Sequence, residues 1–168
     1  MSIAVRPAEA RDASAIRAVH LAAFPDATEA DLVGQLDKDG ASVLSLVAEE
    51  DGEIVGHILM SRMRVEGDGR GFRALGIAPV AVVPERQRAG IGSALIREAL
   101  ARARDAGEQL VFLVGEPDYY RRFGFAAATA ARFASPYAGS YFMARALTDV
   151  DLPRRGRADY APAFAGLE

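Results

Sequence analysis

Apolar and polar residues follow two different periods along this chain, and each change of period marks a new element. Apolar residues three or four positions apart predict amphipathic helices, whereas alternating or continuous apolar runs predict strands. The pattern predicts strands over 3–6, 42–49, 54–65, 72–83, 110–114 and 141–147, with a further strand beginning at Gly124-Phe125. It predicts helices over 12–24, 28–40 and 92–106, and a short helix carrying Tyr119, Tyr120 and Phe123.

Residues with strong local preferences set the ends of these elements. Asp12 and Thr28 are expected to cap the first two helices, and Pro25 ends the first of them. The dipeptide Asp51-Gly52 is typical of a two-residue hairpin turn with positive φ angles, and 67–69 predicts a second turn. Three consecutive strands joined by tight turns predict an antiparallel meander.

The order of the elements is β-α-α-β-β-β-α-β-α-β-β. Antiparallel hairpins come first and a β-α-β crossover follows, so the expected fold class is α/β with a mixed sheet. A chain of 168 residues without repeats or linkers is expected to form a single domain over 1–168. Within it, residues 1–147 are expected to form the core, with 130–140 as a loop. The tail 148–168 is expected to pack on the body.

Composition and charge narrow the functions that the chain can have. It is 51% hydrophobic and 26% charged, with a net charge of −3, so nucleic acid is not an expected partner. It has no cysteine, which excludes disulfides and thiolate nucleophiles, and with two histidines a metal site is not expected. No signal-peptide pattern and no apolar run of about 20 residues is present, so we expect a cytoplasmic protein that does not bind membranes.

The segment 80–95 carries the strongest indication of chemistry. An apolar strand ends, and a short loop with Arg86 and Arg88 leads through Gly90 and Gly92 into a helix. The N–H groups at the start of a helix have no partner within the helix and bind anions such as phosphate. A Gly-x-Gly pair can also be no more than a tight turn, and the two arginines can be ordinary solvated side chains.

Three common nucleotide motifs do not match this segment. A P-loop requires Gly-x-x-x-x-Gly-Lys-Ser/Thr, which the chain lacks. A Rossmann fingerprint requires a third glycine where Leu95 stands, and a kinase glycine loop lies in a hairpin rather than before a helix. A phosphate loop at this place would therefore be of another kind.

The pattern Gln87-x-x-Gly90-x-Gly92 resembles the pyrophosphate loop of the GCN5-related N-acetyltransferase (GNAT) family. The run 78–95 is similar to that family's acetyl-CoA motif, 115–125 is similar to its second cofactor motif, and 55–59 is also family-like. The element order is that of the GNAT fold, and the resemblance, strongest to the bacterial YhbS-type subgroup, covers nearly the whole chain. It implies an N-acetyltransferase that moves the acetyl group of acetyl-CoA directly to a primary amine.

In the family, the backbone N–H groups of this loop bind the pyrophosphate of coenzyme A. Carried over, the cofactor-binding residues of the loop are Gln87, Arg88, Ala89, Gly90, Ile91, Gly92 and Ser93. The glycines allow the phosphate oxygens to approach the backbone, and the side chains of Ala89 and Ile91 are expected to be free to vary. The family has a small residue or glycine where Arg88 stands, so this side chain is expected to point away from the loop interior.

The resemblance also implies roles for the preceding strand. There the pantetheine arm of coenzyme A pairs with main-chain groups, here those of Val80, Ala81 and Val82. The N–H near Val82 would then polarise the thioester carbonyl.

Tyr120 stands where the family has its acidic tyrosine, and it is expected to protonate the departing coenzyme A thiolate. Tyr119 is the alternative acid, and a purely structural role for Tyr120 is also open. Tyr119 and Phe123 are expected to lie against the cofactor. The candidate general bases are Glu116, His57, Glu49, Glu50 and a water molecule.

The acceptor is expected to be a small-molecule or peptide amine, and the sequence does not identify it. Its pocket is expected between the first two helices and the loop 130–140, with Phe24, Tyr137 and Tyr141 as candidate walls. Both a monomer and a homodimer fit the resemblance. A second hypothesis is a non-catalytic sensor or structural protein that binds acyl-CoA with the same fold.

Overall fold

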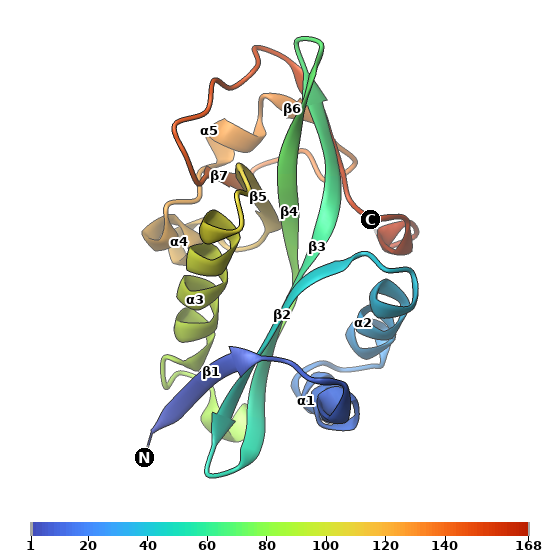
Figure 1. The fold of residues 1–168 in the computed structure, drawn as a ribbon, viewed down its shortest axis with the longest axis vertical. Coiled ribbons are helices and arrows are strands. Elements are labelled where there is room, and N and C mark those ends of the chain that lie inside the picture. Colours follow the sequence, from blue (N-terminus) through green and yellow to red (C-terminus); the bar gives the residue numbers. More distant parts are fainter. Residues whose placement is uncertain (1, 168) are drawn as a thin grey trace. The chain divides into compact units, whose positions relative to one another are not determined.

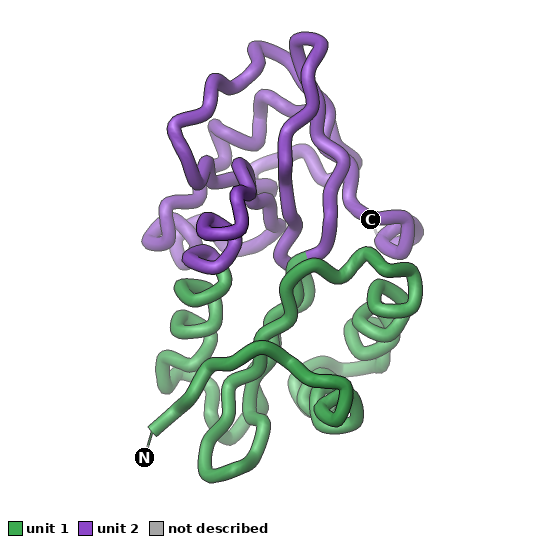
Figure 2. Tube along the Cα trace, viewed as in Figure 1, with its two compact units in different colours: residues 1–60, 78–99 green, residues 61–77, 100–168 purple. Residues whose placement is uncertain are grey.

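The computed structural model describes residues 2–167 and divides the chain into two compact units (Figure 2). Unit 1 contains Met1–Met60 and Ala78–Ala99, and unit 2 contains Ser61–Ile77 and Leu100–Glu168. Two long strands and one helix contribute residues to both units. The expectation of a single domain over 1–168 stays a prediction.

Unit 1 combines all or part of four strands and three α-helices with two short 3-10 helices, which are labelled η (Figure 1). Its elements are β1 (Ile3–Pro7), η1 (Ala10–Asp12), α1 (Ala13–Ala23), α2 (Thr28–Lys38), β2 (Ser42–Glu50), parts of β3 (Glu53–Gly67) and β4 (Arg70–Val82), η2 (Pro84–Arg86) and the first part of α3 (Ile91–Asp105). The strand order is β1-β2-β3-β4, and β1 pairs antiparallel with β2 from Ile3↔Glu50 to Pro7↔Leu46. Helices α1 and α2 contact each other.

The apolar periodicity accounts for the helices of unit 1. In α1 the buried residues are Ile16, Val19 and His20, which share one face of the helix. In α2 the buried residues include Leu32 and Leu36, again four positions apart. Each helix therefore buries one face and leaves the other to solvent.

Unit 2 contains residues 61–77, which include the end of β3 and the first part of β4, and residues 100–168, which begin in the last part of α3. Its further elements are β5 (Leu110–Val114), α4 (Pro117–Tyr120), η3 (Arg121–Phe123), α5 (Ala127–Ala130), β6 (Phe133–Ala134), β7 (Phe142–Ala146), β8 (Gly156–Asp159) and η4 (Pro162–Phe164). Strand β4 pairs parallel with β5, whereas β5–β7 and β3–β8 are antiparallel. This arrangement confirms the mixed sheet.

Aromatic rings form the centre of unit 2. Phe112 of β5 contacts Phe133 edge-on at 5.3 Å between ring centroids and stacks on Phe142 at 5.4 Å.

Unit 2 also contains a buried carboxylate. Glu108, 1% exposed, accepts hydrogen bonds from Arg62 at 2.6 and 2.9 Å and from Arg73 at 2.8 Å. Two arginines therefore compensate its charge.

The two hairpin turns are as predicted. Asp51 and Gly52 have φ angles of 51° and 81°, and Asp68 and Gly69 have φ angles of 52° and 76°. Both central residues of each turn therefore lie in the left-handed region, as a type I′ turn requires. No helix within residues 2–167 is long and apolar enough to cross a membrane.

Two expectations about the later part of the chain were wrong, and one strand was not predicted. The strand expected at Gly124-Phe125 is a single bridge between Ala126 and Ala144, followed by helix α5. The expected loop 130–140 contains β6. The tail contains β8, a strand that the pattern did not predict, which pairs with β3 and β6. Such short strands have too few residues to show a period, and their partners lie far away in sequence.

The helix caps were also only partly correct. Asp12 is the N-cap of α1 by position, but its side chain accepts the Glu9 N–H at 2.7 Å instead of capping α1. The N-cap of α2 is Ala27, and Thr28 is already helical. The Thr28 N–H donates to the side-chain carboxylate of Asp26 at 2.9 Å. The oxygen at the start of α2 therefore comes from Asp26, which the sequence analysis did not name.

Candidate active site

The loop between β4 and α3 has the backbone shape of an anion site. Arg88 and Gly90 have φ angles of 65° and 85°, and α3 begins directly afterwards at Ile91. The first ladder bond joins the Ala94 N–H to the Gly90 carbonyl at 3.0 Å. As a rule, the first N–H groups of a helix have no intrahelical acceptor, and the helix dipole there attracts an anion.

Gly90 fits this loop because of its conformation. A Cβ atom built on it would meet nothing within 4 Å, so the space around it is open. Its φ of 85° is instead the reason that a side chain would be unfavourable. The expected close approach of phosphate to this backbone stays a prediction.

The side chain of Gln87 joins this loop to the end of β4. Its amide Nε2 donates to the Val82 carbonyl at 2.9 Å. The Val83 N–H in turn donates to the Val55 carbonyl of β3 at 2.9 Å. Gln87 thus fixes the loop relative to the strand and uses one acceptor position of the Val82 carbonyl.

The expectation that the side chain of Ile91 is free to vary was wrong. Ile91 is 3% exposed and is part of the core of unit 1. A Cβ atom built on Gly56 would lie 3.2 Å from Ile91 Cγ2 and 3.3 Å from the Ala81 carbonyl oxygen. Ile91 therefore packs close to the backbone of β3, and the start of α3 depends on it.

The two arginines of the loop differ. Arg86 Nε lies 2.5 Å from Oε1 of the buried Glu50, and this hydrogen bond raises the pKa of the Arg86 guanidinium. Its charge is therefore matched within the protein, so it is not an additional free cation for phosphate. Arg88 is exposed, which agrees with a side chain that points away from the loop interior.

The edge of β4 is open where the pantetheine arm was predicted. The parallel ladder between β4 and β5 ends at the pair Gly76↔Phe112, although β4 continues to Val82. Within residues 2–167, no strand pairs with β4 on this side beyond Gly76. The last residues of β4 thus present main-chain groups to which an extended chain can be added.

The segment 117–123 carries the predicted acid. A Cβ atom built on Gly115 would overlap the ring of Tyr120, so this ring lies directly on the Gly115 backbone. Tyr119 contacts Tyr120 edge-on at 4.9 Å, and Phe125 contacts it at 6.2 Å. Burial is the main cause that raises the pKa of the Tyr120 phenol, and the neighbouring Tyr119 is the second. The phenol is therefore protonated at neutral pH.

Most of the candidate bases are already engaged. His57 is 0% exposed and lies 2.8 Å from Ser45 through Nε2 and 2.8 Å from His20 Nε2 through Nδ1. Burial, and secondarily His20, lowers its pKa to about 3, so His57 is a neutral structural residue. Glu49 pairs with Arg6 at 3.2 Å.

Glu50 pairs with Arg86, as described above. Glu116 is exposed at the N-cap position of α4 and makes no side-chain capping bond there. Glu116 and water therefore remain as candidate bases. No group of three metal-ligating side chains exists among residues 2–167.

The three aromatic residues predicted to line the acceptor pocket have different neighbours and different exposure. Phe24 stacks on His20 with ring centroids 6.0 Å apart, and Tyr137 contacts Tyr160 edge-on at 5.2 Å. Tyr141 is 54% exposed. Their common pocket stays a prediction.

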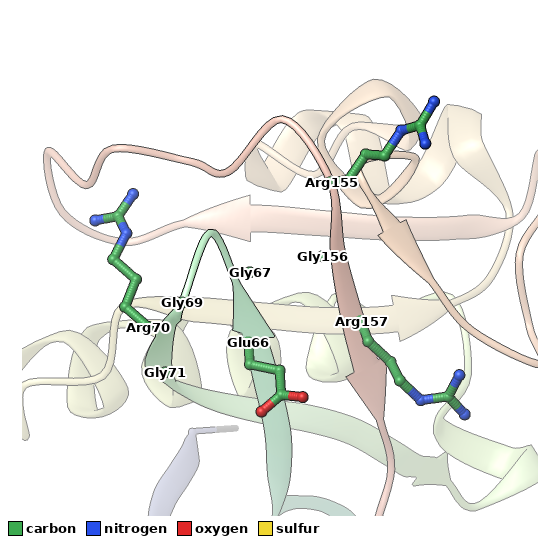
Figure 3. Close-up of a pocket in the computed structure, with 8 residues that line it drawn as sticks. All are labelled: Glu66, Gly67, Gly69, Arg70, Gly71, Arg155, Gly156 and Arg157. Carbon is green, nitrogen blue, oxygen red and sulfur yellow. The ribbon is translucent and has the colours of Figure 1, made fainter.

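Two of the cavities contain none of the predicted cofactor-binding residues, although the candidate base Glu49 lines the second of them. One, of about 580 Å³, lies at the β3–β4 turn of unit 2 (Figure 3). Its lining includes Arg70, Arg155 and Arg157, but Figure 3 shows their guanidinium groups pointing in different directions. They do not converge on one anion.

The other cavity, of about 540 Å³, is lined by α1 and the β2–β3 hairpin in unit 1. At its edge Arg6 bonds to Asp12 at 2.8 and 3.1 Å, which lowers the pKa of the Asp12 carboxyl to about 2. The apolar period did not indicate this ion pair, because it joins a strand to a helix cap.

Comparison with known proteins is consistent with these features. A family model described as an acetyltransferase (GNAT) domain matches residues 4–128. The uncharacterized N-acetyltransferase YjhQ of Escherichia coli K12 is 43% identical over 116 residues, which are 68% of this chain and 64% of YjhQ. The chain thus spans slightly less than two thirds of that relative. The uncharacterized N-acetyltransferase YhbS of the same organism is 35% identical over 115 residues, 68% of each protein.

Two solved structures are similar over almost their whole length. The complex of Escherichia coli YhbS with CoA has a TM-score of 0.86 and 30% identity, covering 96% of this chain and 91% of that one. A GNAT acetyltransferase of Brucella melitensis in complex with acetyl-CoA has a TM-score of 0.80 and 38% identity, covering 97% and 98%. The chain therefore belongs to the GNAT acetyltransferase family.

Proposed function

We propose that this protein is an N-acetyltransferase that moves the acetyl group of acetyl-CoA to a primary amine. The observation that carries the proposal is the loop 87–93 at the start of α3, in a chain of the GNAT family. The YhbS and Brucella melitensis structures, which contain CoA and acetyl-CoA, support the same donor.

The donor is bound mainly by backbone in this proposal. The N–H groups of the loop 88–93 take the pyrophosphate, and Gln87 maintains the loop through its bond to Val82. The pantetheine arm pairs with the open edge of β4 at Val80, Ala81 and Val82, and the N–H near Val82 polarises the thioester carbonyl.

The reaction is a direct attack of the amine nitrogen on the thioester carbon. A C–N bond forms, the tetrahedral intermediate collapses, and the C–S bond breaks with release of the coenzyme A thiolate. Tyr120 donates its phenolic proton to this thiolate. Because its pKa is raised, the phenol is protonated and can act as the donor. The amine, whose pKa is about 10.4 in a lysine-type acceptor, loses its proton to Glu116 or to water.

Calorimetry and a thiol-release assay test this proposal. Because the chain has no cysteine, a chromogenic disulfide reagent detects only the coenzyme A thiol. Acetyl-CoA is expected to bind whereas ATP and NAD do not, and thiol release is expected with some members of a panel of amines. Binding of ATP without coenzyme A would refute the donor. Tight binding of coenzyme A with no transfer to any amine would favour the sensor.

The substitution Tyr120→Phe tests the acid, with Tyr119→Phe as its matched control. Tyr120→Phe is expected to lower kcat by about 10²-fold, the lower end of the usual contribution of a general acid, without changing the affinity for acetyl-CoA. Tyr119→Phe is expected to have a smaller effect on kcat. The reverse order would assign the acid to Tyr119.

A further inference from the structure

The helical segment that carries Tyr120 ends at Gly124, and a side chain from another strand binds this end. Arg145 Nη1 donates to the Phe123 carbonyl at 2.8 Å. The last carbonyls of a helical segment have no partner within it, and a charged donor there also interacts favourably with the helix dipole. This hydrogen bond therefore stabilises the C-terminal end of the segment.

Gly124 and Arg145 are fitted to each other. A Cβ atom built on Gly124 would lie 3.1 Å from Arg145 Nε and 3.2 Å from Arg145 Cδ. Gly124 also has a φ of 87°, which closes the segment in the left-handed conformation. The arginine side chain thus extends along the backbone of the residue that ends the helical segment.

Arg145 has a defined position of its own. It lies on β7, where it is paired with Val111 of the buried strand β5. Its side chain is half-buried and donates a hydrogen bond to the main-chain carbonyl of Phe123. Within residues 2–167 no carboxylate forms an ion pair with it, so its charge serves the end of the segment.

Tyr120 lies one turn before this bond. Its ring rests on Gly115 at the start of the segment and contacts Phe123 at 6.4 Å at the other end. The segment has only seven residues, and few internal hydrogen bonds maintain its shape. Its orientation therefore depends on contacts at both ends.

We infer that Arg145 is a positioning residue, which holds the segment 117–123 through the Phe123 carbonyl and thereby fixes the hydroxyl of Tyr120. This inference rests on the proposed function, in which Tyr120 is the general acid. Arg145 itself takes no part in the chemistry.

A tyrosine titration tests the inference without any turnover. The absorbance of tyrosinate is followed against pH in the wild type, and Tyr120→Phe identifies the step that belongs to Tyr120 among the five tyrosines. Arg145→Met is expected to shift this step down, toward the value of about 10 for an exposed phenol, because the ring loses its enclosure. Arg145→Lys, which retains a donor, is expected to restore most of the shift.

Arg132→Met is the matched control, because Arg132 also donates to a main-chain carbonyl, that of Pro153 at 3.1 Å. It is expected to leave the Tyr120 step unchanged. If Arg145→Met also leaves it unchanged in a folded protein, the inference is wrong. If Arg145→Met does not fold, Gly124→Ala disturbs the same contact from the other side, and an unchanged step in that variant refutes the inference equally.

Kinetics provide a second, independent readout. Arg145→Met is expected to lower kcat about tenfold with less than a twofold change in KM for acetyl-CoA, since a small displacement of a catalytic group has large effects. In the Tyr120→Phe background the same substitution is expected to change kcat less than twofold. Equal losses in both backgrounds would mean a general structural role. If the wild type transfers no acetyl group, the proposed function fails while the titration still decides the inference.

Discussion

Mild acid is expected to destabilise unit 1 through its two buried histidines. His20 and His57 are both 0% exposed and face each other at 2.8 Å, so neither can accept a proton without placing a charge in the core. Burial lowers the pKa of His20 to about 4, and burial together with His20 lowers that of His57 to about 3. In the unfolded chain both values return to about 6.5.

The sign of the effect follows from proton binding. Between pH 6.5 and about 4 the unfolded chain binds protons that the native histidines do not, so the free energy of unfolding falls as the pH falls. Each pH unit below 6.5 removes about 1.4 kcal/mol per histidine. At pH 5 the loss is about 2 kcal/mol for each histidine and about 4 kcal/mol for both. The Asp12 carboxyl, with a pKa of about 2, loses its contribution only at lower pH.

Urea unfolding at pH 7 and pH 5, followed by circular dichroism because the chain has no tryptophan, measures this loss. His20→Gln is expected to halve the difference between the two pH values. Since these are the only two histidines of the sequence, replacing both removes histidine titration altogether. Free energies that agree within about 1 kcal/mol at both pH values in the wild type would refute the assignment of a neutral buried pair.

Three further substitutions test the loop and the tyrosine. Arg88→Gly is expected to raise the free energy of unfolding by up to about 1 kcal/mol, since a positive φ favours glycine, and a loss would contradict this. Ile91→Ala is expected to cost about 2–4 kcal/mol in urea unfolding, whereas a side chain free to vary would cost nothing measurable. Gly115→Ala is expected to displace the Tyr120 ring and lower kcat about tenfold, with acetyl-CoA affinity by calorimetry unchanged.

The parts of the fold that the sequence predicted correctly are those that depend on neighbours along the chain. Asp51-Gly52 defines its turn by itself, and α1 and α2 show their buried faces within eleven residues each. Strands β6 and β8 have two and four residues and exist through pairing with distant segments. A pattern of hydrophobic residues within such short segments cannot predict that pairing.

The same distinction applies to the site. The loop before α3 was predicted from its glycine motif, because a loop is a property of the local backbone, but the motif was interpreted as room for phosphate and not as the positive φ of Gly90. The bond from Arg145 to Phe123 could not be predicted in this way, because it joins residues that are 22 positions apart. His57 was one of several candidate bases, with a structural role as the alternative. The burial and the contact to His20 that decide between these two roles are visible only in the structure.

Polar side chains of the proposed donor loop, and one that binds the Tyr120 segment, form hydrogen bonds to the protein itself. Gln87 bonds to the Val82 carbonyl, Arg86 to Glu50, and Arg145 to the Phe123 carbonyl. Their role is to hold backbone in place, and in the proposal it is backbone that binds coenzyme A. The sequence motif of such a site is therefore a requirement of the main-chain conformation, and in the proposal this conformation selects coenzyme A as the donor. The amine must be recognised by side chains that this motif does not specify, so the panel of amines is the experiment that can identify the acceptor.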